Sequence, residues 1–319
     1  MTKRIVLVTL LLIFKVSLSG FAQETPIADL QRAANRFSST LAQSLPLNAS
    51  LGLNWSDAHI GRFPRFGVGV SAGFTTIELS EMEALAEIFG FDGLPNMDRF
   101  PFPGYAVEAR LGGFVLPFDI GFKFGYLPPV GIGDIDIDYM LIGGSIRYAV
   151  LNRPILPTIS LGVGFNFLRG SIGGRAPASG ASFTVDMNGM PQTITIDSRP
   201  EVNLHWQTFA LDFTAQISRS FLIFTPYLGL GLSYAWSTAG YEVDANISGL
   251  DPAVITHLRR EGIDVSDTGM SSEVDRSDSS IRVFGGISFN MAVIRLDLTG
   301  IYSFRDGNYG ASVGLRFQL

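Results

Sequence analysis

The sequence predicts a transmembrane antiparallel β-barrel of about ten strands, and the last eleven residues show why. In residues 309–319 the odd positions are apolar, while the even positions are small or polar. Such alternation places the two sets on opposite faces of a strand. The chain is 46% hydrophobic, yet after its N-terminal stretch it has no run of about 18 apolar residues that would form a spanning helix. A closed barrel is the other structure that leaves no backbone polar group facing lipid.

The N-terminus indicates export. Lys3 and Arg4 precede the apolar run 5–14, and residues 20–22 offer small side chains at both cleavage-determining positions. This pattern is typical of a signal peptide, which we place at residues 1–22. Its removal takes three of the 23 basic residues and leaves a net charge of −9, which does not favour nucleic acid as a partner. The absence of cysteine excludes a lipid-anchored N-terminal cysteine and a disulfide framework.

Residues 23–60 do not fit a barrel wall. Their apolar residues recur at helical spacing from Ile27 to Leu45, and Pro46 ends that pattern. A short alternating piece follows at 49–55, but counting it as a strand would give eleven, whereas single-chain bacterial barrels have even numbers. We therefore expect an N-terminal helix and lead-in. It is either a plug inside the lumen or a periplasmic accessory beside the barrel.

The wall is expected at residues 61–319. Its ten segments are roughly 65–79, 104–116, 118–127, 136–150, 157–169, 203–218, 220–237, 280–290, 292–305 and 308–319. A water-soluble sandwich would also bury one face of each strand, but its exposed face would be rich in Lys, Glu and Thr. Here the polar face is mostly Gly and Ser, which favours a lumen. Pro226 lies within the seventh segment, where we expect a bulge.

Connections between these segments alternate between short and long, as in outer-membrane barrels. Short turns are typical of the periplasmic side, so the long loops 80–103, 170–202 and 238–279 should be external and both termini periplasmic. Within the second loop, Asn188-Gly189 between two alternating stretches predicts a small hairpin. In the third, Asp251-Pro252 predicts the start of a short helix.

A tight Asp306-Gly307 turn predicts the register of the last hairpin. Two-residue closure would make partner numbers sum to 613 and set Asp297 directly opposite Arg316. The same arithmetic across Leu116-Pro117 would set Arg110 opposite Lys123, which is a repulsive pair unless another charge lies between them.

Eleven charged residues are expected to face the lumen. They are Arg65, Glu108, Arg110, Asp119, Lys123, Arg147, Asp212, Arg282, Arg295, Asp297 and Arg316. Seven are basic and four acidic, so the lumen should be net positive. Basic rings can favour anions, although inward ions also pair across strands for purely structural reasons. Glycine on the inward faces leaves space that water, a helix or an apolar ligand could occupy.

Catalytic patterns are weak. His59, His205 and His257 have no spacing that aligns a nucleophile with its base. The acidic third loop has no calcium-loop pattern. We therefore expect no enzyme, no metal and no cofactor.

The C-terminal residues Ser312, Gly314, Phe317 and Leu319 resemble the assembly signal of outer-membrane β-barrels, although that family prefers an aromatic residue at the very end. Together with the signal peptide and the ten segments, they make the chain similar to the porin-like superfamily of bacterial outer-membrane barrels. It is closest to uncharacterised barrel families with an N-terminal helical lead-in, here containing Asn54-Trp55. The resemblance implies residence in the outer membrane of a diderm bacterium. It also implies lipid and the barrel-assembly machinery as partners.

Two functions remain open from the sequence. The first is a channel or transporter for a small anionic or apolar solute, gated by residues 23–60. The second is a structural or surface-adhesion barrel that acts through its long external loops.

Overall fold

The computed structural model describes residues 25–60, 65–78, 98–113, 116–132, 135–152, 156–175, 181–187, 190–196, 201–244, 247–248, 252–260, 264–266 and 269–319. The predicted signal peptide at 1–22 lies outside these residues, as does much of the three predicted long loops.

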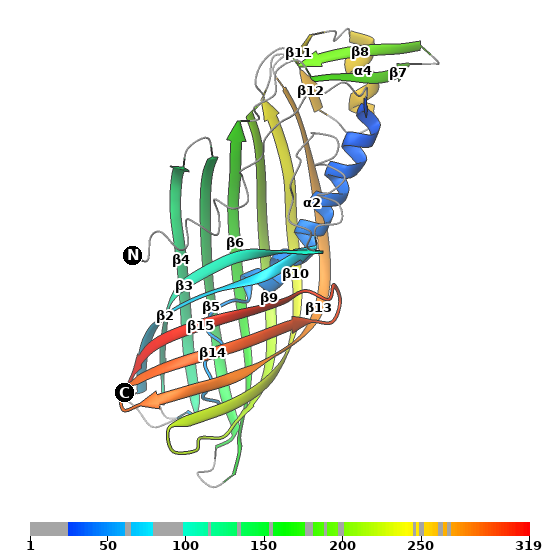
Figure 1. Cartoon of the computed structure of the whole chain (residues 1–319). Helices are drawn as coiled ribbons and strands as arrows, with labels where there is room; N and C mark the ends of the chain where they lie inside the picture. The colour runs from blue at the N-terminus through cyan, green and yellow to red at the C-terminus, as the bar shows by residue number, and fades with distance from the viewer. Residues whose placement is uncertain are drawn as a thin grey trace.

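Ten antiparallel strands form a closed barrel, as predicted (Figure 1). They are β2 (Arg65–Glu78), β3 (Arg99–Gly112), β4 (Phe118–Ile132), β5 (Ile135–Leu151), β6 (Thr158–Arg175), β9 (Glu201–Ser218), β10 (Phe224–Asp244), β13 (Gly269–Met291), β14 (Ile294–Ser303) and β15 (Tyr309–Gln318). Each pairs with its neighbours in this order, and β15 pairs with β2 to close the ring. Closure removes the free sheet edges that neither lipid nor water could satisfy.

The outer face of the wall is apolar and exposed. On β10, Leu228, Leu230 and Leu232 are 55, 56 and 48% exposed, whereas the alternate position Ser233 is 1% exposed. This arrangement is the reverse of a water-soluble protein and suits a wall surrounded by lipid, as in outer-membrane barrels. Among the described residues, no helix is both long and apolar enough to cross a bilayer.

The two ends of the barrel differ. Short turns join strands at one end, for example around Leu222 and Ala292, which adopt positive φ. At the other end β9, β10 and β13 continue as a tall wall beyond the rim formed by β14 and β15 (Figure 1). The predicted loops 80–103, 170–202 and 238–279 are accordingly shorter than expected. Outside the membrane neither strand face has to be apolar, so these extensions lack the alternation that marks the spanning part.

Small elements sit at the long-loop end. The predicted hairpin is confirmed as β7 (Ala181–Met187) and β8 (Met190–Ile196), and the predicted helix as α4 (Pro252–Arg260). The hairpin is joined by β1 (Thr25–Pro26) and β11 (Ile247–Ser248) into a four-stranded sheet. A further short strand, β12 (Asp264–Ser266), pairs with β13.

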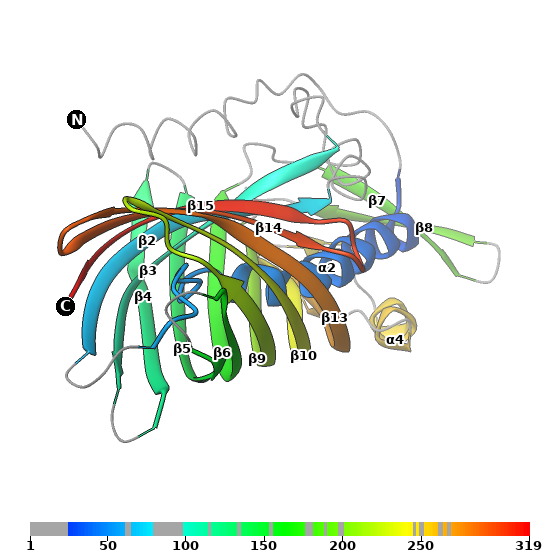
Figure 2. The ribbon, with the colours of Figure 1, turned by 90° about the horizontal axis from the view of Figure 1, so that it is seen from below.

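The N-terminal segment lies within the ring of strands (Figure 2). Helix α2 (Ile27–Ala49) starts beside β1 at the long-loop end, and the lead-in 50–60 continues to the short-turn end, where β2 begins. We call residues 35–60 the plug. The prediction that both termini are periplasmic is therefore wrong for the N-terminal side, because β1 pairs with β7 at the opposite end.

The helix also runs past Pro46, where the sequence pattern had ended it. Its final carbonyl groups find partners in the surrounding structure, since Ser50 N donates to Pro46 O at 3.2 Å and Lys123 Nζ donates to Ala49 O at 2.6 Å. Satisfied terminal carbonyls allow a last turn that propensity alone disfavours.

Both predicted registers are wrong by two residues. In the last hairpin Asp297 lies opposite Gly314, so partners sum to 611. Gly307 has the expected positive φ, but the connection is wider because Ser303 N donates to Asn308 O and Asn308 also bonds Ser44 of the plug. Asp297 and Arg316 still share a face and form a diagonal ion pair of 2.7 Å.

The same slip relieves the expected repulsion between β3 and β4. Glu108 lies opposite Lys123, and Arg110 lies opposite Gly121. The bulge expected at Pro226 is absent, because pairing with β9 begins only at Tyr227 and the missing N–H costs no bond. Register shifts occur instead between Leu127 and Val130 of β4 and between Ala149 and Leu151 of β5.

The position of β1 gives a test of topology. An epitope tag inserted directly before Thr25 should bind an antibody added to intact cells, because β1 lies at the long-loop end. A tag in the turn after Leu151 should bind only after the outer membrane is permeabilised. A Thr25 tag that also requires permeabilisation would contradict this orientation of the plug.

Candidate functional site

The lumen has two zones, and the one nearer the long loops is apolar. Phe37, Leu41 and Leu45 of α2 pack against inward-facing residues of the wall. We call these wall residues the apolar collar: Ile77, Phe102, Ala106, Tyr139, Leu141, Leu168, Trp206 and Ala239. Leu45, Leu141 and Leu168 are fully buried. The helical half of the plug is held by this packing together with hydrogen bonds to the wall, such as the one that Asn48 Nδ2 donates to Phe102 O at 3.2 Å.

The zone nearer the short turns is charged, and it contains the eleven residues expected to face the lumen. Nine of them are less than 9% exposed: Glu108, Arg110, Asp119, Lys123, Arg147, Asp212, Arg282, Asp297 and Arg316. The other two, Arg65 and Arg295, are partly exposed and close to the short-turn end. The structure gathers most of this set around the lead-in of the plug.

A twelfth charge, which the sequence analysis missed, organises the network. Asp57 of the lead-in lies 3.0 Å from Arg65, 2.6 Å from Arg295 and 3.8 Å from Arg316. Asp57 does not belong to a spanning strand. Burial raises the pKa of Asp57, but the guanidinium groups of Arg316, Arg295 and Arg65 outweigh burial and lower the pKa to about 2. Its carboxylate therefore stays ionised throughout the physiological pH range.

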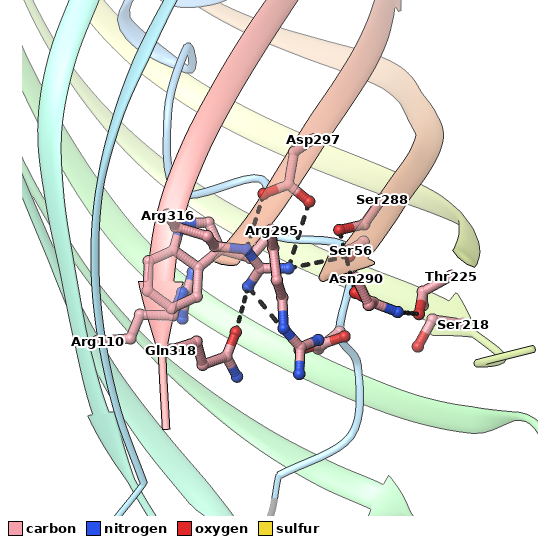
Figure 3. A network of polar contacts seen from close by, with 12 residues as sticks. Ser56, Arg110, Ser218, Thr225, Ser288, Asn290, Arg295, Asp297, Arg316 and Gln318 are labelled. Carbon is pink, nitrogen blue, oxygen red and sulfur yellow. Dashed lines mark hydrogen bonds and ion pairs between the residues drawn. The ribbon is translucent and has the colours of Figure 1, made fainter. Parts of the chain in front are cut away.

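Arg316 joins the plug to the last two strands (Figure 3). It contacts Asp297 of β14, donates to Ser56 Oγ at 3.0 Å and donates to Gln318 Oε1 at 2.8 Å. Its guanidinium also lies 4.6 Å from the centre of the Trp55 ring. One side chain thus makes ion pairs with Asp297 and Asp57, two further hydrogen bonds and a cation–π contact.

Trp55 is the centre of the lead-in. Its Nε1 donates to Glu108 Oε2 at 2.5 Å, and Arg110 covers the ring at 5.5 Å. Gln216 Nε2 donates to the carbonyl groups of Trp55 and Ser56 at 2.8 and 3.0 Å. The ring fits because β2 carries glycine at 67, where a Cβ would stand 2.7 Å from Trp55 Cη2. Glycine on this inward face thus permits close approach of the plug.

The backbone of the lead-in is also bonded to the wall. Lys123 Nζ donates to Leu51 O at 2.5 Å, and Arg110 Nη2 donates to Leu53 O at 2.8 Å. Ala58 N donates to Ser218 Oγ at 2.8 Å. These bonds replace the water that an irregular segment at this depth would otherwise need.

The remaining charges pair within the wall. Asp119 accepts from Arg110 at 2.7 Å and from Arg147 at 2.6 Å. Asp212 accepts from Arg282 at 2.8 Å. Two cavities beside Trp55 measure about 20 and 10 Å³. Each holds about one water molecule. With the plug in place, these cavities have no room for a larger solute.

Other predicted residues are not brought together. His59 lies at the short-turn end, His205 lies in the tall wall and His257 lies in α4. Within the described ranges, no three His, Asp or Glu residues are placed to hold a metal ion. Of the four residues predicted to form an assembly signal, Phe317 and Leu319 are exposed on the lipid face. Ser312 and Gly314 line the larger cavity inside.

The plug residues were missed for a specific reason. Trp55 ends the short alternating piece and Asp57 lies two residues beyond it, so alternation did not show which wall residues they would contact. An acidic residue two positions after a tryptophan, in a segment next to a basic lumen, was the available signal.

No protein-family model matches the chain, and no curated protein is significantly similar to it in sequence. Among solved structures, the chain resembles the outer membrane protease OmpT of Escherichia coli, with 12% identity and a TM-score of 0.45, covering 83% of this chain and all of that one. It also resembles the attachment invasion locus protein Ail of Yersinia pestis, with 10% identity and a TM-score of 0.30, covering 80% of this chain and 99% of that one. A third similar structure is the toluene transporter TbuX of Ralstonia pickettii, with 9% identity and a TM-score of 0.27. The match covers 82% of this chain and 90% of that one.

Asp57→Asn tests the central charge. The variant leaves three guanidinium groups without their carboxylate, and breaking a buried pair costs about 3–5 kcal/mol. We expect a clear fall in the temperature at which the heat-modified gel band appears. Asp244→Asn, at an exposed site on β10, is the matched control and should leave this temperature unchanged. Equal behaviour of the two variants would contradict the role of Asp57.

Two substitutions separate the contributions of Trp55. Trp55→Phe keeps a ring between Arg110 and Arg316 but removes the donor to Glu108, which costs about 1.5–3 kcal/mol for a bond to a charged group. Trp55→Ala also removes the ring and should destabilise further, as measured by the same thermal shift. A Phe variant as weak as the Ala variant would assign the whole effect to the Nε1 bond.

Proposed function

We propose that this protein passes a small solute across the outer membrane and that the plug gates the passage. The observation that supports the proposal is the chemistry between the lead-in and the wall. That contact consists of ion pairs and hydrogen bonds, with Asp57, Trp55 and Lys123 at its centre.

A plug needed only for stability would be better built from apolar residues. Replacing buried ion pairs by well-packed apolar side chains is often neutral or stabilising. A charged contact, in contrast, leaves a surface that water wets readily once the plug moves. The charged zone therefore suits a lumen that opens, whereas the apolar collar suits the part of the plug that stays anchored.

The charges also bear on selectivity. The wall contributes seven basic and four acidic side chains, a balance of +3, and Asp57 of the plug reduces it to +2. Withdrawal of the lead-in thus leaves the lumen more positive. Rings of Arg and Lys of this kind favour anions.

A surface role is the second candidate, and the tall wall favours it. Strands β9, β10 and β13 carry 18, 21 and 23 residues, whereas β14 and β15 carry ten each. The extra length, together with β7, β8 and α4, forms an ordered platform at the long-loop end. A structural or adhesion barrel would act through that platform with the lumen permanently closed.

Single-channel recordings distinguish the two functions. The wild-type protein should show rare, small openings in planar bilayers, and Asp57→Asn should raise the frequency of openings because the lead-in loses its strongest tie. Reversal potentials in a salt gradient should show anion preference. If Asp57→Asn folds and inserts but stays silent, gated passage is wrong.

A disulfide lock gives the converse test. The chain has no cysteine, and Ala58 N lies 2.8 Å from Ser218 Oγ, so Ala58→Cys with Ser218→Cys should tie the lead-in to β9. Openings should disappear when the bond forms and return on reduction. Each single variant serves as the control and should respond to neither treatment.

A further inference from the structure

One seam of the wall has fewer residue pairs than any other, since the remaining seams have nine or more. Strands β3 and β4 share six residue pairs, from Val107↔Phe124 to Gly112↔Asp119, whereas β2 and β3 share fourteen. Above this point residues 99–106 pair only with β2, and residues 125–127 and 130–132 pair only with β5, among the described residues. Figure 1 shows β2 and β3 curving across the barrel while β4 and β5 rise.

Prolines occupy both edges where pairing stops. They are Pro101 and Pro103 on β3, and Pro128 and Pro129 on β4. The N–H and C=O of one strand residue point to the same side. Since Tyr105 O lies against Gly125 of β4, positions 101 and 103 would direct their N–H groups toward β4 as well. The N–H groups that Pro101 and Pro103 lack are therefore those that would donate to β4 across the seam.

The register places a proline of β3 opposite a proline of β4, so both strands lack a donor at the same position. Partners across β3 and β4 sum to 231, so continuation of the pairing would place Pro103 opposite Pro128. Neither residue has an N–H, so this pair cannot form a backbone hydrogen bond in either direction. The same prolines prevent an added strand from binding to these edges. The sequence thus keeps the seam open and excludes a peptide as its occupant.

Two tyrosines meet at the point where the pairing of β3 and β4 stops. Tyr105 faces outward from β3 and is 38% exposed, whereas Tyr139 faces inward from β5 and is 7% exposed, yet their rings stack at 5.4 Å. Rings on opposite faces of an intact wall would be separated by the sheet. Gly125 permits the contact, because a Cβ there would lie 3.1 Å from Tyr139 Cε1.

The apolar collar lies directly behind the seam. Phe102 of β3 belongs to it and contacts Trp206 edge-on at 5.2 Å, and Tyr139 is itself a collar residue. On the outer side, Tyr105 and Tyr126 are exposed aromatic residues of the kind that lie at a membrane interface. Aromatic and apolar side chains therefore continue from the outer face, through the Tyr105–Tyr139 stack, to the collar around the helical part of the plug.

We propose that the β3–β4 seam is a lateral opening through which a neutral apolar solute passes between the outer membrane interface and the apolar collar. Tyr139 acts as its inner lid. This inference rests on the proposed function and adds to it an entry point for neutral apolar solutes, beside the anions that the charged zone favours. The charged zone below the collar is the part of the path that the lead-in controls.

Cross-linking tests the opening. Phe100→Cys and Gly131→Cys place one thiol on each edge without changing a proline, and a series of bis-maleimides of increasing length identifies the one that bridges them. Entry of N-phenylnaphthylamine, a neutral apolar dye, into intact cells should then fall to the rate of cells lacking the protein. The control pair, Asn203→Cys with Glu242→Cys, bridges the fully paired β9–β10 seam and should have no effect.

Removal of the lid is the second test. Tyr139→Ala should accelerate dye entry, whereas Tyr241→Ala, a buried tyrosine at a fully paired position, should not. The opening is refuted if complete cross-linking or loss of the Tyr139 ring leaves dye entry unchanged. It is also refuted if the two edge cysteines form a disulfide spontaneously, because such a bond requires edges already within pairing distance.

Ion conductance separates this inference from the proposed function. In one outcome, Asp57→Asn still shows channel openings, and the cross-linked and wild-type proteins admit dye equally. This outcome would refute the lateral opening but not the gated passage. In the other outcome, Asp57→Asn shows no channel openings, but the cross-link still blocks dye entry. This outcome would refute gating by the lead-in and support the lateral opening.

Discussion

The ion pairs of Asp57 connect the two problems that this chain has to solve, closing a barrel and filling it. The three arginines around Asp57 come from β2, β14 and β15, which flank the point where the last strand meets the first. Three guanidinium groups at this point would repel one another without a carboxylate between them. The plug supplies that carboxylate. Filling the lumen and completing the closure of the wall therefore depend on the same residue.

The division of the lumen follows from the same constraint. At the long-loop end the plug is a helix whose backbone bonds are internal, so packing against the collar and a few side-chain hydrogen bonds hold it in place. Below Ala49 the chain is irregular, and its carbonyl groups need donors such as Lys123 and Arg110. The basic lumen thus has a structural reason that is independent of any solute. In an opened state, the same donors would face whatever replaces the lead-in.

The wall shows how few residues decide whether a sheet is sealed. The seam between the first and last strand has nine residue pairs. Pro103 and Pro128 end one seam early, and Gly125 lets Tyr139 fill the resulting space from inside. These residues are individually unremarkable in the sequence. Their meaning depends on a register that places two prolines opposite each other.

The sequence by itself determined the barrel, its ten strands and the set of charges that face inward. These features follow from the period of two in side-chain direction, which is local and survives in every strand. Only the tertiary structure decided the registers, the direction of the plug and the partners of Asp57. A slip of two residues keeps every side chain on its face of the sheet. Alternation therefore cannot distinguish the predicted register of the last hairpin, in which partner numbers sum to 613, from the observed one, in which they sum to 611. The plug contacts residues as far away as Arg316, 260 positions from Ser56, and no local pattern encodes that distance.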